Sequence, residues 1–192
     1  WKYTTGTMNG INQRPYLTPN NRVKFLGNFN EFEETEDFMR GYISGMFHGD
    51  GYIGIRKEKR IGFKDNQMLR LALTDIEALN RTEKYLEYFG FKNLHKMLFY
   101  KAKKLSEHNA YCFYSFRLDN FIKLKELMIL SENKEIMRGW VSGFFDAEGS
   151  YSGNNIRIAN TKESLINYCY QCLRRYGFEP TIENYKNHCK VI

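Results

Sequence analysis

One twelve-residue stretch occurs twice in this chain, and this internal repeat constrains the possible fold more than any other feature. Arg40–Gly51 reads RGYISGMFHGDG and Arg138–Gly149 reads RGWVSGFFDAEG, with six identical positions. A second pair follows in the same order, because Leu69–Phe91 matches Ile156–Phe178 at seven of 23 positions without a gap. Repeated blocks in a fixed order indicate duplicated structural units that pack against each other. The sequence therefore predicts two copies of one unit.

The hydrophobic pattern predicts the same elements in both copies. Residues 36–48 and 135–147 have helical periodicity and end at glycine-rich turns. Alternating segments that follow predict strands at Tyr52–Arg56, Met68–Leu73, Tyr151–Gly153 and Asn155–Ala159. Two amphipathic helices come next, at Thr74–Tyr88 and Thr161–Tyr176, for which the threonines are the expected N-caps and Gly90 and Gly177 the expected stops.

The remainder of the first copy completes the unit. Leu94–Lys101 and Tyr111–Leu118 read as a further strand pair, and Asn120–Leu130 reads as a closing helix. One copy is therefore αββαββα. The second copy has only 14 residues after Phe178, so we expect it to lack its last strand and its closing helix. The predicted class is α+β, with an N-terminal segment at 1–36, a first half-domain at 37–135 and an incomplete second half-domain at 136–192.

Each repeated helix carries two glycines one turn apart. The pairs are Gly41 with Gly45 and Gly139 with Gly143. Glycine inside a helix costs up to about 1 kcal/mol against alanine, so a pair at this spacing in both copies needs a compensating contact. Small residues on one helix face allow two backbones to approach closely. We therefore expect the two helices to pack through these four glycines.

An acidic residue ends each repeated helix, Asp50 in the first copy and Glu148 in the second. If the helices pair in parallel, the two carboxylates meet at one end, beside two negative helix termini. A divalent cation would relieve this repulsion, and carboxylate oxygens favour Mg²⁺ over zinc. Metal held by carboxylates next to basic strands indicates phosphodiester cleavage.

These residues carry a resemblance to a known family. Ile43–Gly51 (ISGMFHGDG) and Val141–Gly149 (VSGFFDAEG) resemble the nine-residue LAGLIDADG motif, and the αββαββα unit resembles that family's fold, with antiparallel saddle sheets. The resemblance covers about residues 37–192 and implies a homing endonuclease of the monomeric two-motif type. It implies Asp50 and Glu148 as metal ligands, with Gly49 and Ala147 beside them in the metal site. Asp146 keeps the aspartate of the motif in the second copy, whereas His48 replaces it at the equivalent position of the first copy.

The resemblance also implies supporting polar and basic residues around the metal. By position these are Asn160 at the end of a second-copy strand and Arg117 in the fourth strand of the first copy. The first copy has Ala72 and Leu73 opposite the polar position. In the family, double-stranded DNA lies across the saddle at a long pseudo-symmetric site, and strands can read base edges in the major groove. The candidate nucleic-acid-binding residues are Arg56, Lys57, Arg60, Lys64, Arg70, Lys96, Tyr100, Lys101, Lys103, Asn154, Asn155, Arg157, Tyr185 and Lys186. For any one of them, a plain solvated position is the alternative.

The N-terminal segment contains a second resemblance. Leu17–Val23 reads LTPNNRV, which resembles an intein block usually written Thr-x-x-His, with Asn21 at the place of the catalytic histidine. This implies an intein-derived origin and argues against active splicing. The alternative is a Pro-Asn turn between two strands. The chain starts at Trp1, which suggests an excerpt of a longer product.

Composition narrows the remaining classes. The formal net charge is +7, which favours a polyanionic partner. The four cysteines form no disulfide framework, so we expect an intracellular, cytoplasmic setting, or an organellar one if the gene lies in an intron. Cys169, Cys172, His188 and Cys189 offer zinc as a weaker hypothesis, against helix packing of the first two. No run of 18 apolar residues occurs, so no membrane span is expected.

Three function classes follow from these patterns. The first is a Mg²⁺-dependent endonuclease that makes a double-strand cut in DNA. The second is an RNA maturase on the same fold, which would use the surface but not the acids. The third is a non-catalytic DNA-binding protein. Because both acids are present, the sequence favours the nuclease.

Overall fold

The computed structural model describes residues 7–8, 11–12, 33–57, 65–104, 107–152, 155–184 and 190–192. The chain divides into two compact units, Trp1–Glu33 and Glu34–Ile192. In the first unit, β1 (Thr7–Met8) pairs antiparallel with β2 (Ile11–Asn12). The intein-like block Leu17–Val23 lies outside the described residues.

The first copy of the repeat has the predicted αββαββα order. Its elements are α1 (Glu36–Gly49), β3 (Gly51–Arg56), β4 (Asn66–Leu73), α2 (Ile76–Tyr88), β5 (His95–Tyr100), β6 (Ala110–Ser115) and α3 (Leu118–Leu127). The four strands form one antiparallel sheet in the order β3-β4-β6-β5. The closing helix begins two residues before the predicted position and ends three residues earlier.

The second copy repeats this topology with shorter strands. Its elements are α4 (Lys134–Glu148), β7 (Gly149–Ser152), β8 (Asn155–Asn160), α5 (Glu163–Arg175), β9 (Glu183–Asn184) and β10 (Lys190–Val191). The sheet order β7-β8-β10-β9 matches that of the first copy. The prediction that the last strand is missing is wrong, because β10 pairs with β8 as β6 pairs with β4. Among the described residues no helix follows α5.

The predicted threonine N-caps are also wrong. Asp75, one residue after Thr74, caps α2 and accepts hydrogen bonds from the backbone N–H groups of Glu77 and Ala78. Asp75 is the better cap because its carboxylate accepts hydrogen bonds from the unpaired N–H groups of the first helical turn. Its negative charge also interacts favourably with the positive end of the helix dipole. In the second copy Lys162 occupies the cap position without a side-chain bond. The predicted stops are confirmed, with positive φ of 73° at Gly90 and 83° at Gly177.

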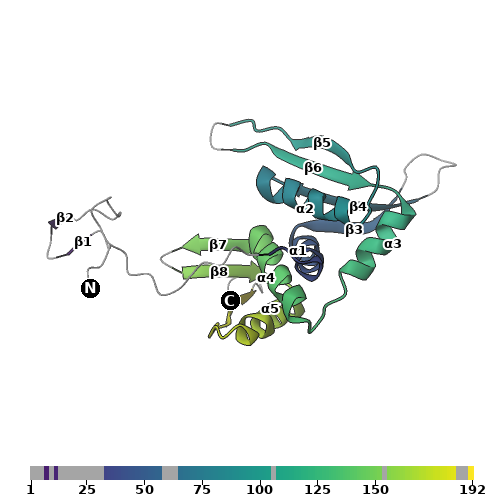
Figure 1. The fold of residues 1–192 in the computed structure, drawn as a ribbon. Coiled ribbons are helices and arrows are strands. Elements are labelled where there is room, and N and C mark those ends of the chain that lie inside the picture. The colour runs from purple at the N-terminus through teal and green to yellow at the C-terminus, as the bar shows by residue number, and fades with distance from the viewer. Residues whose placement is uncertain are drawn as a thin grey trace. The chain divides into compact units, whose positions relative to one another are not determined.

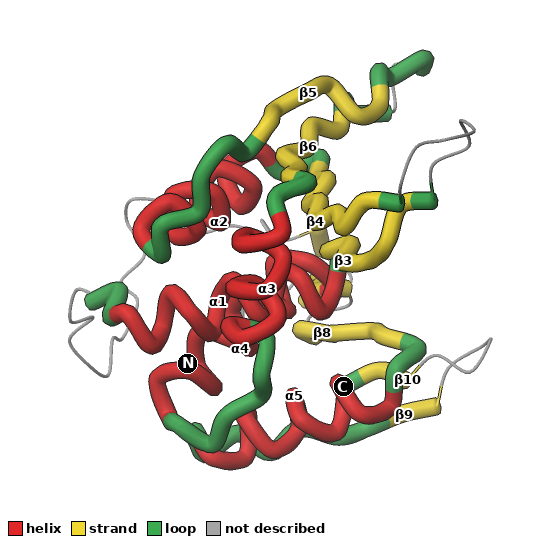
Figure 2. The backbone as a smooth tube through the Cα atoms, turned by 90° about the vertical axis from the view of Figure 1, so that its right-hand side faces the viewer, coloured by secondary structure: helices red, strands yellow, loops and turns green. Residues whose placement is uncertain are grey.

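The two repeated helices lie side by side between the two sheets (Figures 1 and 2). Leu69, Leu71 and Leu73 of β4 point to one side and are buried in one core with residues of α1 and α2, as their alternation requires. The second half has its own smaller core around Trp140 and Phe144 of α4. The motif helices therefore contribute to both cores while packing against each other.

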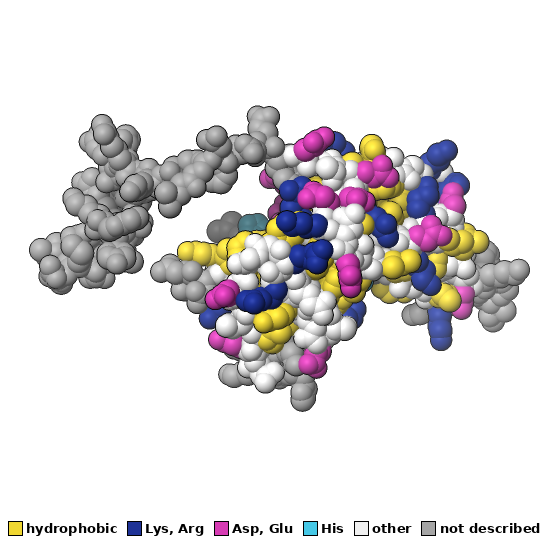
Figure 3. All heavy atoms as spheres, turned by 60° about the horizontal axis from the view of Figure 1, so that its bottom comes forward, with side chains coloured by type: hydrophobic (Ala, Val, Ile, Leu, Met, Phe, Trp, Pro, Cys, Tyr) yellow, Lys and Arg dark blue, Asp and Glu magenta, His cyan; other side chains and the backbone are white. Residues whose placement is uncertain are grey.

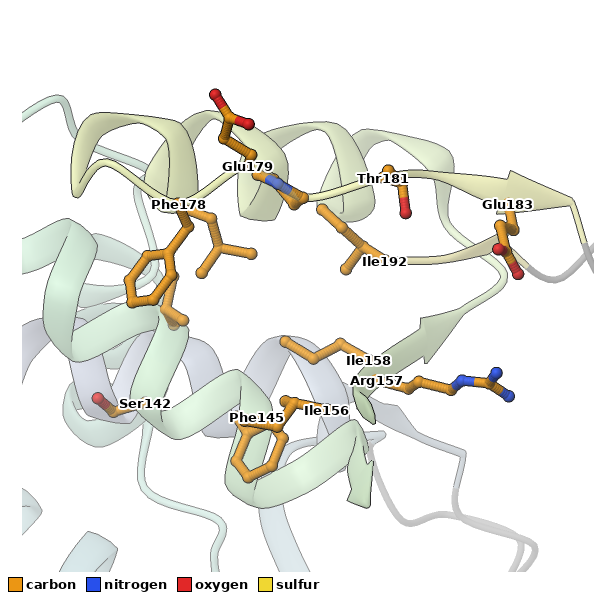
Figure 4. A pocket seen from close by; sticks show the side chains of 13 residues that line it. Ser142, Phe145, Ile156, Arg157, Ile158, Phe178, Glu179, Thr181, Glu183 and Ile192 are labelled. Atoms are coloured by element: carbon orange, nitrogen blue, oxygen red, sulfur yellow. The ribbon is translucent and has the colours of Figure 1, made fainter. Parts of the chain in front are cut away.

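The two halves differ in how completely their cores are covered. Leu69 and Phe91 are 0% and 4% exposed, whereas their repeat equivalents Ile156 and Phe178 are 69% and 60% exposed. In the first half α3 packs against α1 and β4 and buries Leu124 completely. In the second half, Ile156 and Phe178 line a cavity of about 730 Å³ between α4, β8 and α5 (Figure 4).

This difference predicts unequal costs for the same kind of truncation. Leu69→Ala should lower the free energy of unfolding by about 2–5 kcal/mol, because it leaves a cavity in a filled core. Ile156→Ala, the matched control at the repeat-equivalent position, should cost less than about 1 kcal/mol. Urea unfolding followed by circular dichroism measures both. Equal losses would contradict the unequal coverage of the two cores.

All four repeated glycines lie at the contact between α1 and α4. A methyl group at Gly41 would lie 2.1 Å from the carbonyl oxygen of Ile136, and one at Gly139 would lie 2.0 Å from that of Phe38. The same clash with a backbone carbonyl oxygen occurs at 2.2 Å for the other two glycines, Gly45 and Gly143. The backbones therefore touch directly, and no larger residue fits without separating the helices.

The glycine contact determines whether a Gly→Ala substitution raises or lowers the free energy of unfolding. In an uncrowded helix Gly45→Ala would gain up to about 1 kcal/mol from helix propensity. Here the methyl group would meet the backbone of Trp140 at 2.2 Å, so we expect a loss of about 1–3 kcal/mol in the free energy of unfolding. Asn80→Ala, on the exposed side of α2, is the control and should be neutral or slightly stabilising. Chemical denaturation measures both, and a stabilised Gly45→Ala protein would contradict the contact.

Candidate metal centre and nucleic-acid interface

The helix contact brings the two acidic residues to one end of the helix pair. Gly41 meets Ile136 and Gly45 meets Trp140, so the contact advances along both chains in the same direction and the helices are parallel. Asp50 is the C-cap of α1, and Glu148 is the last residue of α4. The carboxylate oxygen Oε1 of Glu148 lies 3.7 Å from the position that a Cβ would take on Gly49, next to Asp50.

The electrostatics at this end disfavour two free carboxylates. Burial raises the pKa of Asp50 above its ordinary value. Burial is also the main reason for the raised pKa of Glu148, and the negative charge of Asp50 raises it further. Both groups also lie at helix C-termini, where the helix dipole adds negative potential. The pair therefore carries unfavourable charge that a cation would neutralise.

Asn160 supports Glu148 directly. Its side-chain amide donates a hydrogen bond of 2.7 Å to Oε1 of Glu148, and its own Oδ1 accepts one of 2.8 Å from the backbone N–H of Lys162. The hydrogen bond from Asn160 and the positive charge of Lys162 both lower the pKa of Glu148, against the effects of burial and Asp50. The sequence reasoning had not selected Lys162. Its position two residues after Asn160 was the available signal.

The two acids have unequal surroundings. The repeat equivalent of Asn160 is Leu73, which is 7% exposed and belongs to the first core. The equivalent of Lys162 is Asp75, which caps α2. Asp50 therefore has no amide or ammonium at the places where Glu148 has both. A hollow beside Asp50 is lined by Asp75 and by Asp146 among other residues, so the first-copy side of the centre is more acidic.

The donor set fits a hard divalent cation. Two carboxylates are oxygen donors of the kind that Mg²⁺ and Ca²⁺ prefer. Within the described part of the chain no cluster of three or more His, Cys, Asp or Glu side chains could hold a metal ion. Asp50 and Glu148 would therefore share the cation with water or substrate oxygens. Zinc finds no support there, since Cys169 and Cys172 are fully buried in the second core while His188 and Cys189 lie outside the described residues.

A reciprocal pair of hydrogen bonds crosses the helix contact just before the acids. The Tyr42 hydroxyl donates to Asp146 at 2.5 Å, and the indole N–H of Trp140 donates to Nδ1 of His48 at 3.1 Å. Tyr42 and Trp140 are repeat equivalents, as are His48 and Asp146. Burial and the carboxylate of Asp146 raise the pKa of Tyr42, so its hydroxyl stays protonated. His48, which departs from the family pattern, is thus in contact with Trp140, and its Nδ1 also lies 2.9 Å from the carbonyl oxygen of Ser44.

The hydrogen bond between Tyr42 and Asp146 can be tested by a double-mutant cycle. Tyr42→Phe, Asp146→Asn and the double variant should show a coupling of about 1–2 kcal/mol in the free energy of unfolding. Tyr88→Phe, at an exposed tyrosine of α2, is the control and should be neutral. Additive single effects would show that the bond does not stabilise the helix pair.

Arg117 is not where the sequence placed it. It lies after the end of β6 and is the N-cap of α3, with its guanidinium 2.6 Å from Asp119. In the sheet register Gly51 pairs with Leu71, and Leu71 with Phe113. Arg117 follows Phe113 by four residues, about 13 Å along the strand direction at the usual rise. The structure therefore does not bring Arg117 to the acids, because β6 runs away from their end of the sheet and Arg117 follows its far end.

The candidate nucleic-acid-binding residues divide into three groups. Arg56 and Arg70 lie on the face of the first sheet that its helices leave open, and Arg157 is exposed on β8. Lys96 lies on the opposite face, where its ammonium is 2.6 Å from Glu83 of α2. Lys57, Lys101, Lys103 and Tyr100 are exposed beyond or at the ends of strands, and Tyr100 donates to Glu107. Arg60, Lys64, Asn154, Tyr185 and Lys186 lie outside the described residues, as does the side chain of Asn155.

Charge on the face shown in Figure 3 is mixed. Basic and acidic side chains are interspersed there, with no extended region of one sign. The net charge of +7 is therefore not gathered on that face. Among the described residues no helix is long and apolar enough to cross a membrane.

Comparison with known proteins agrees with this architecture. A family model described as "LAGLIDADG-like domain" matches residues 135–191. An uncharacterized protein of Methanocaldococcus jannaschii is 26% identical over 163 residues, which span 77% of this chain and 57% of that protein. The chain thus corresponds to little more than half the length of this relative.

Solved structures with the same fold include I-DmoI and DUF199/WhiA. I-DmoI in complex with DNA and Mn matches with a TM-score of 0.65 at 14% identity, over 82% of this chain and 89% of that one. The N-terminal LAGLIDADG domain of DUF199/WhiA matches with a TM-score of 0.52 at 12% identity, over 82% and 75%. Full-length DUF199/WhiA from Thermotoga maritima matches with a TM-score of 0.57 at 11% identity, over 84% and 52%. At these identities the likeness establishes the fold alone.

Proposed function

We propose that the chain is a divalent-metal-dependent DNA endonuclease of the LAGLIDADG type that cuts both strands. Residues 135–191 match a LAGLIDADG-like domain, and the two repeated helices bring Asp50 and Glu148 to the same end of the helix pair. The observation that carries this proposal is the pair of partly desolvated carboxylates at the parallel helix ends, whose charges repel. Fold stability alone gains nothing from such a pair.

The residues of the proposed site have different roles. Asp50 and Glu148 hold the cation, and the backbone at Gly49 and Ala147 shapes the centre around them. Asn160 fixes the orientation of Glu148, and Lys162 adds positive charge where phosphate would approach. When bound, Mg²⁺ or a similar cation would activate water and stabilise the leaving oxygen. Crystals of the structurally similar I-DmoI contain DNA with Mn or Ca, and a variant was solved with DNA and Mg.

One chain supplies both halves of the proposed site, so we propose that it acts as a monomer on a long duplex target. The halves are pseudo-symmetric but unequal, since among the described residues Glu148 has Asn160 and Lys162 nearby whereas the equivalent positions beside Asp50 are Leu73 and Asp75. The proposed DNA site is accordingly pseudo-symmetric rather than palindromic.

A non-catalytic DNA-binding function is the alternative on the same fold. A role as an RNA maturase is another use of the same surface. Neither function needs two acids held at the helix ends, and neutral residues there would remove the repulsion. The retained acid pair is therefore the feature that supports the nuclease.

The decisive experiment replaces the acids without changing their shape. The target is first selected from a randomised duplex library by cutting in Mg²⁺. Asp50→Asn or Glu148→Gln should then lower the rate of double-strand cutting by at least about 100-fold or leave a nick, while the double variant should bind DNA without cutting. Glu77→Gln, at an exposed carboxylate on α2, is the control and should cut normally. Mn²⁺ titration followed by electron paramagnetic resonance should show that the double variant loses the bound ion.

Two results would reject the nuclease. One is cutting of both strands by the double variant at the wild-type rate. The other is selective DNA binding by the wild-type protein without cutting in Mg²⁺ or Mn²⁺, which would favour the non-catalytic alternative.

A further inference from the structure

The side of the second sheet that faces the helices is open to water at positions that are covered in the first sheet. Tyr151 of β7 and Ile156 of β8 pair with each other on this side and are 71% and 69% exposed. The corresponding pair of the first sheet is Ile53 and Leu69. Leu69 is fully buried, and Ile53 packs against the first core. Equivalent apolar positions are therefore buried in one half and exposed in the other.

The first half shows what covers these positions. α3 packs against α1 and β4 and buries the side chain of Leu124 completely. Leu127 and the C-cap residue Met128 also pack against the first core. These three residues have the spacing i, i+3 and i+4, which places them on one face of a helix. The cover of the first core is therefore the apolar face of a single amphipathic helix.

Polar contacts hold α3 in this position. The ammonium of Lys123 donates hydrogen bonds of 3.0 Å and 3.3 Å to the carbonyl oxygens of Phe89 and Gly90, which follow α2. A cation at a helix C-terminus also interacts favourably with the negative end of the helix dipole. The side-chain amide of Asn120 donates a hydrogen bond of 2.7 Å to the carbonyl oxygen of Lys92. The covering helix thus places a lysine directly beside its apolar face.

In the second half the matching place is the cavity of about 730 Å³ between α4, β8 and α5. Phe145 and Ile156 lie on one side of this cavity, and Phe178 lies on the other (Figure 4). Among the described residues no helix covers it, since none follows α5. We call this cavity the second-core groove, and its apolar lining comes mainly from Val141, Phe145, Ile156, Ile158, Leu173 and Phe178.

Charge at the second-core groove favours a helix with a cation beside its apolar face. Glu179 and Glu183 line the groove, and the side chain of Glu179 stays mostly exposed although an arginine lies 3.7 Å away. Tyr176 and Gly177 are the repeat equivalents of the two residues whose carbonyl oxygens Lys123 contacts. A lysine or arginine of a docked helix would therefore have acceptors at the equivalent place.

The second-core groove lies on the opposite side of the second sheet from the candidate DNA contact Arg157. Side chains alternate along a strand, so Ile156 and Ile158 point to the helix side and Arg157 between them points to the other side. A molecule in the groove and DNA on the open face of the sheet therefore do not compete for the same side chains.

We propose that the second-core groove binds an amphipathic helix of a partner protein, in the position that α3 takes in the first half. Apolar residues of that helix, spaced i, i+3 and i+4, enter the groove between Ile156 and Phe178. A lysine or arginine beside them meets Glu179 and the carbonyl oxygens at the end of α5. This interaction does not depend on the proposed cleavage of DNA.

A peptide with the sequence of α3 is the probe for this helix. Fluorescein-labelled Arg117–Leu130 carries the apolar face together with Lys123. Fluorescence anisotropy should show that it binds both residues 1–192 and the complete gene product. Ile156→Asp and Phe178→Asp should each weaken binding at least about 10-fold, because a charge replaces an apolar contact. Ile76→Asp, at a half-exposed isoleucine of α2, is the matched control and should bind the peptide as the wild type does.

Three further measurements locate the bound peptide. The peptide with Leu124→Asp should not bind, because the side chain that α3 buries completely is then charged. In hydrogen exchange, the amides of β8 and α5 should exchange more slowly in the complex, whereas those of α2 should not change. A copy of Arg117–Leu130 fused after Ile192 should occupy the groove and prevent the free peptide from binding, because its local concentration is higher.

Three results would overturn the proposal. The first is an α3 peptide that does not bind, or that binds the Ile156→Asp protein as well as the wild type. The second is a peptide that binds residues 1–192 but not the complete gene product, which would assign the groove to a helix of the same polypeptide. The third is a concentration-dependent dimer in sedimentation that Ile156→Asp abolishes, which would show that a second copy of the chain covers the groove. Each outcome is independent of whether the Asp50→Asn/Glu148→Gln protein cuts DNA.

Discussion

The direct backbone contact between α1 and α4 is the constraint from which the arrangement of the candidate site follows. Four glycines allow it, and at each of them a single methyl group would come within 2.0–2.2 Å of a carbonyl oxygen of the other helix. Such a contact tolerates little sliding or rotation, because close-packed backbones have no flexible side chains to adjust. The helix pair is therefore a rigid base for whatever stands at its ends.

Rigidity at the contact fixes the acids. Asp50 and Glu148 are the end residues of helices that run in parallel, so neither can move away from the other without breaking the glycine contact. The contacts of Tyr42 with Asp146 and of Trp140 with His48 add a second set of links, because Asp146 and His48 lie two residues before the acids. Repulsion between the acids is thus sustained by packing, as the proposed cation site requires.

The duplication set up symmetry, and substitutions have since removed much of it. Among the described residues, Glu148 has an amide and an ammonium beside it, whereas the equivalent positions near Asp50 are Leu73 and Asp75. In the first sheet Arg70 lies over the rings of Tyr52 and Phe99, whereas its equivalent Arg157 is paired with Ser150. Only the first core has a described helix, α3, covering it. A fold with two equal halves would present the same surface twice, whereas this one offers different chemistry on each side of the helix pair.

Sequence alone determined the two copies, most element boundaries, the glycine faces and the pairing of the acids, because these depend on local periodicity and on the repeat. Tertiary structure decided which face of each strand the helices cover, which turns Lys96 toward Glu83 and leaves Tyr52 and Phe99 open. It also removed Arg117 from the strand and placed Lys162 near Glu148. The alternation of a strand shows which residues share a face. It does not show which charged residue of another element lies against that face, because that residue comes from a distant part of the chain.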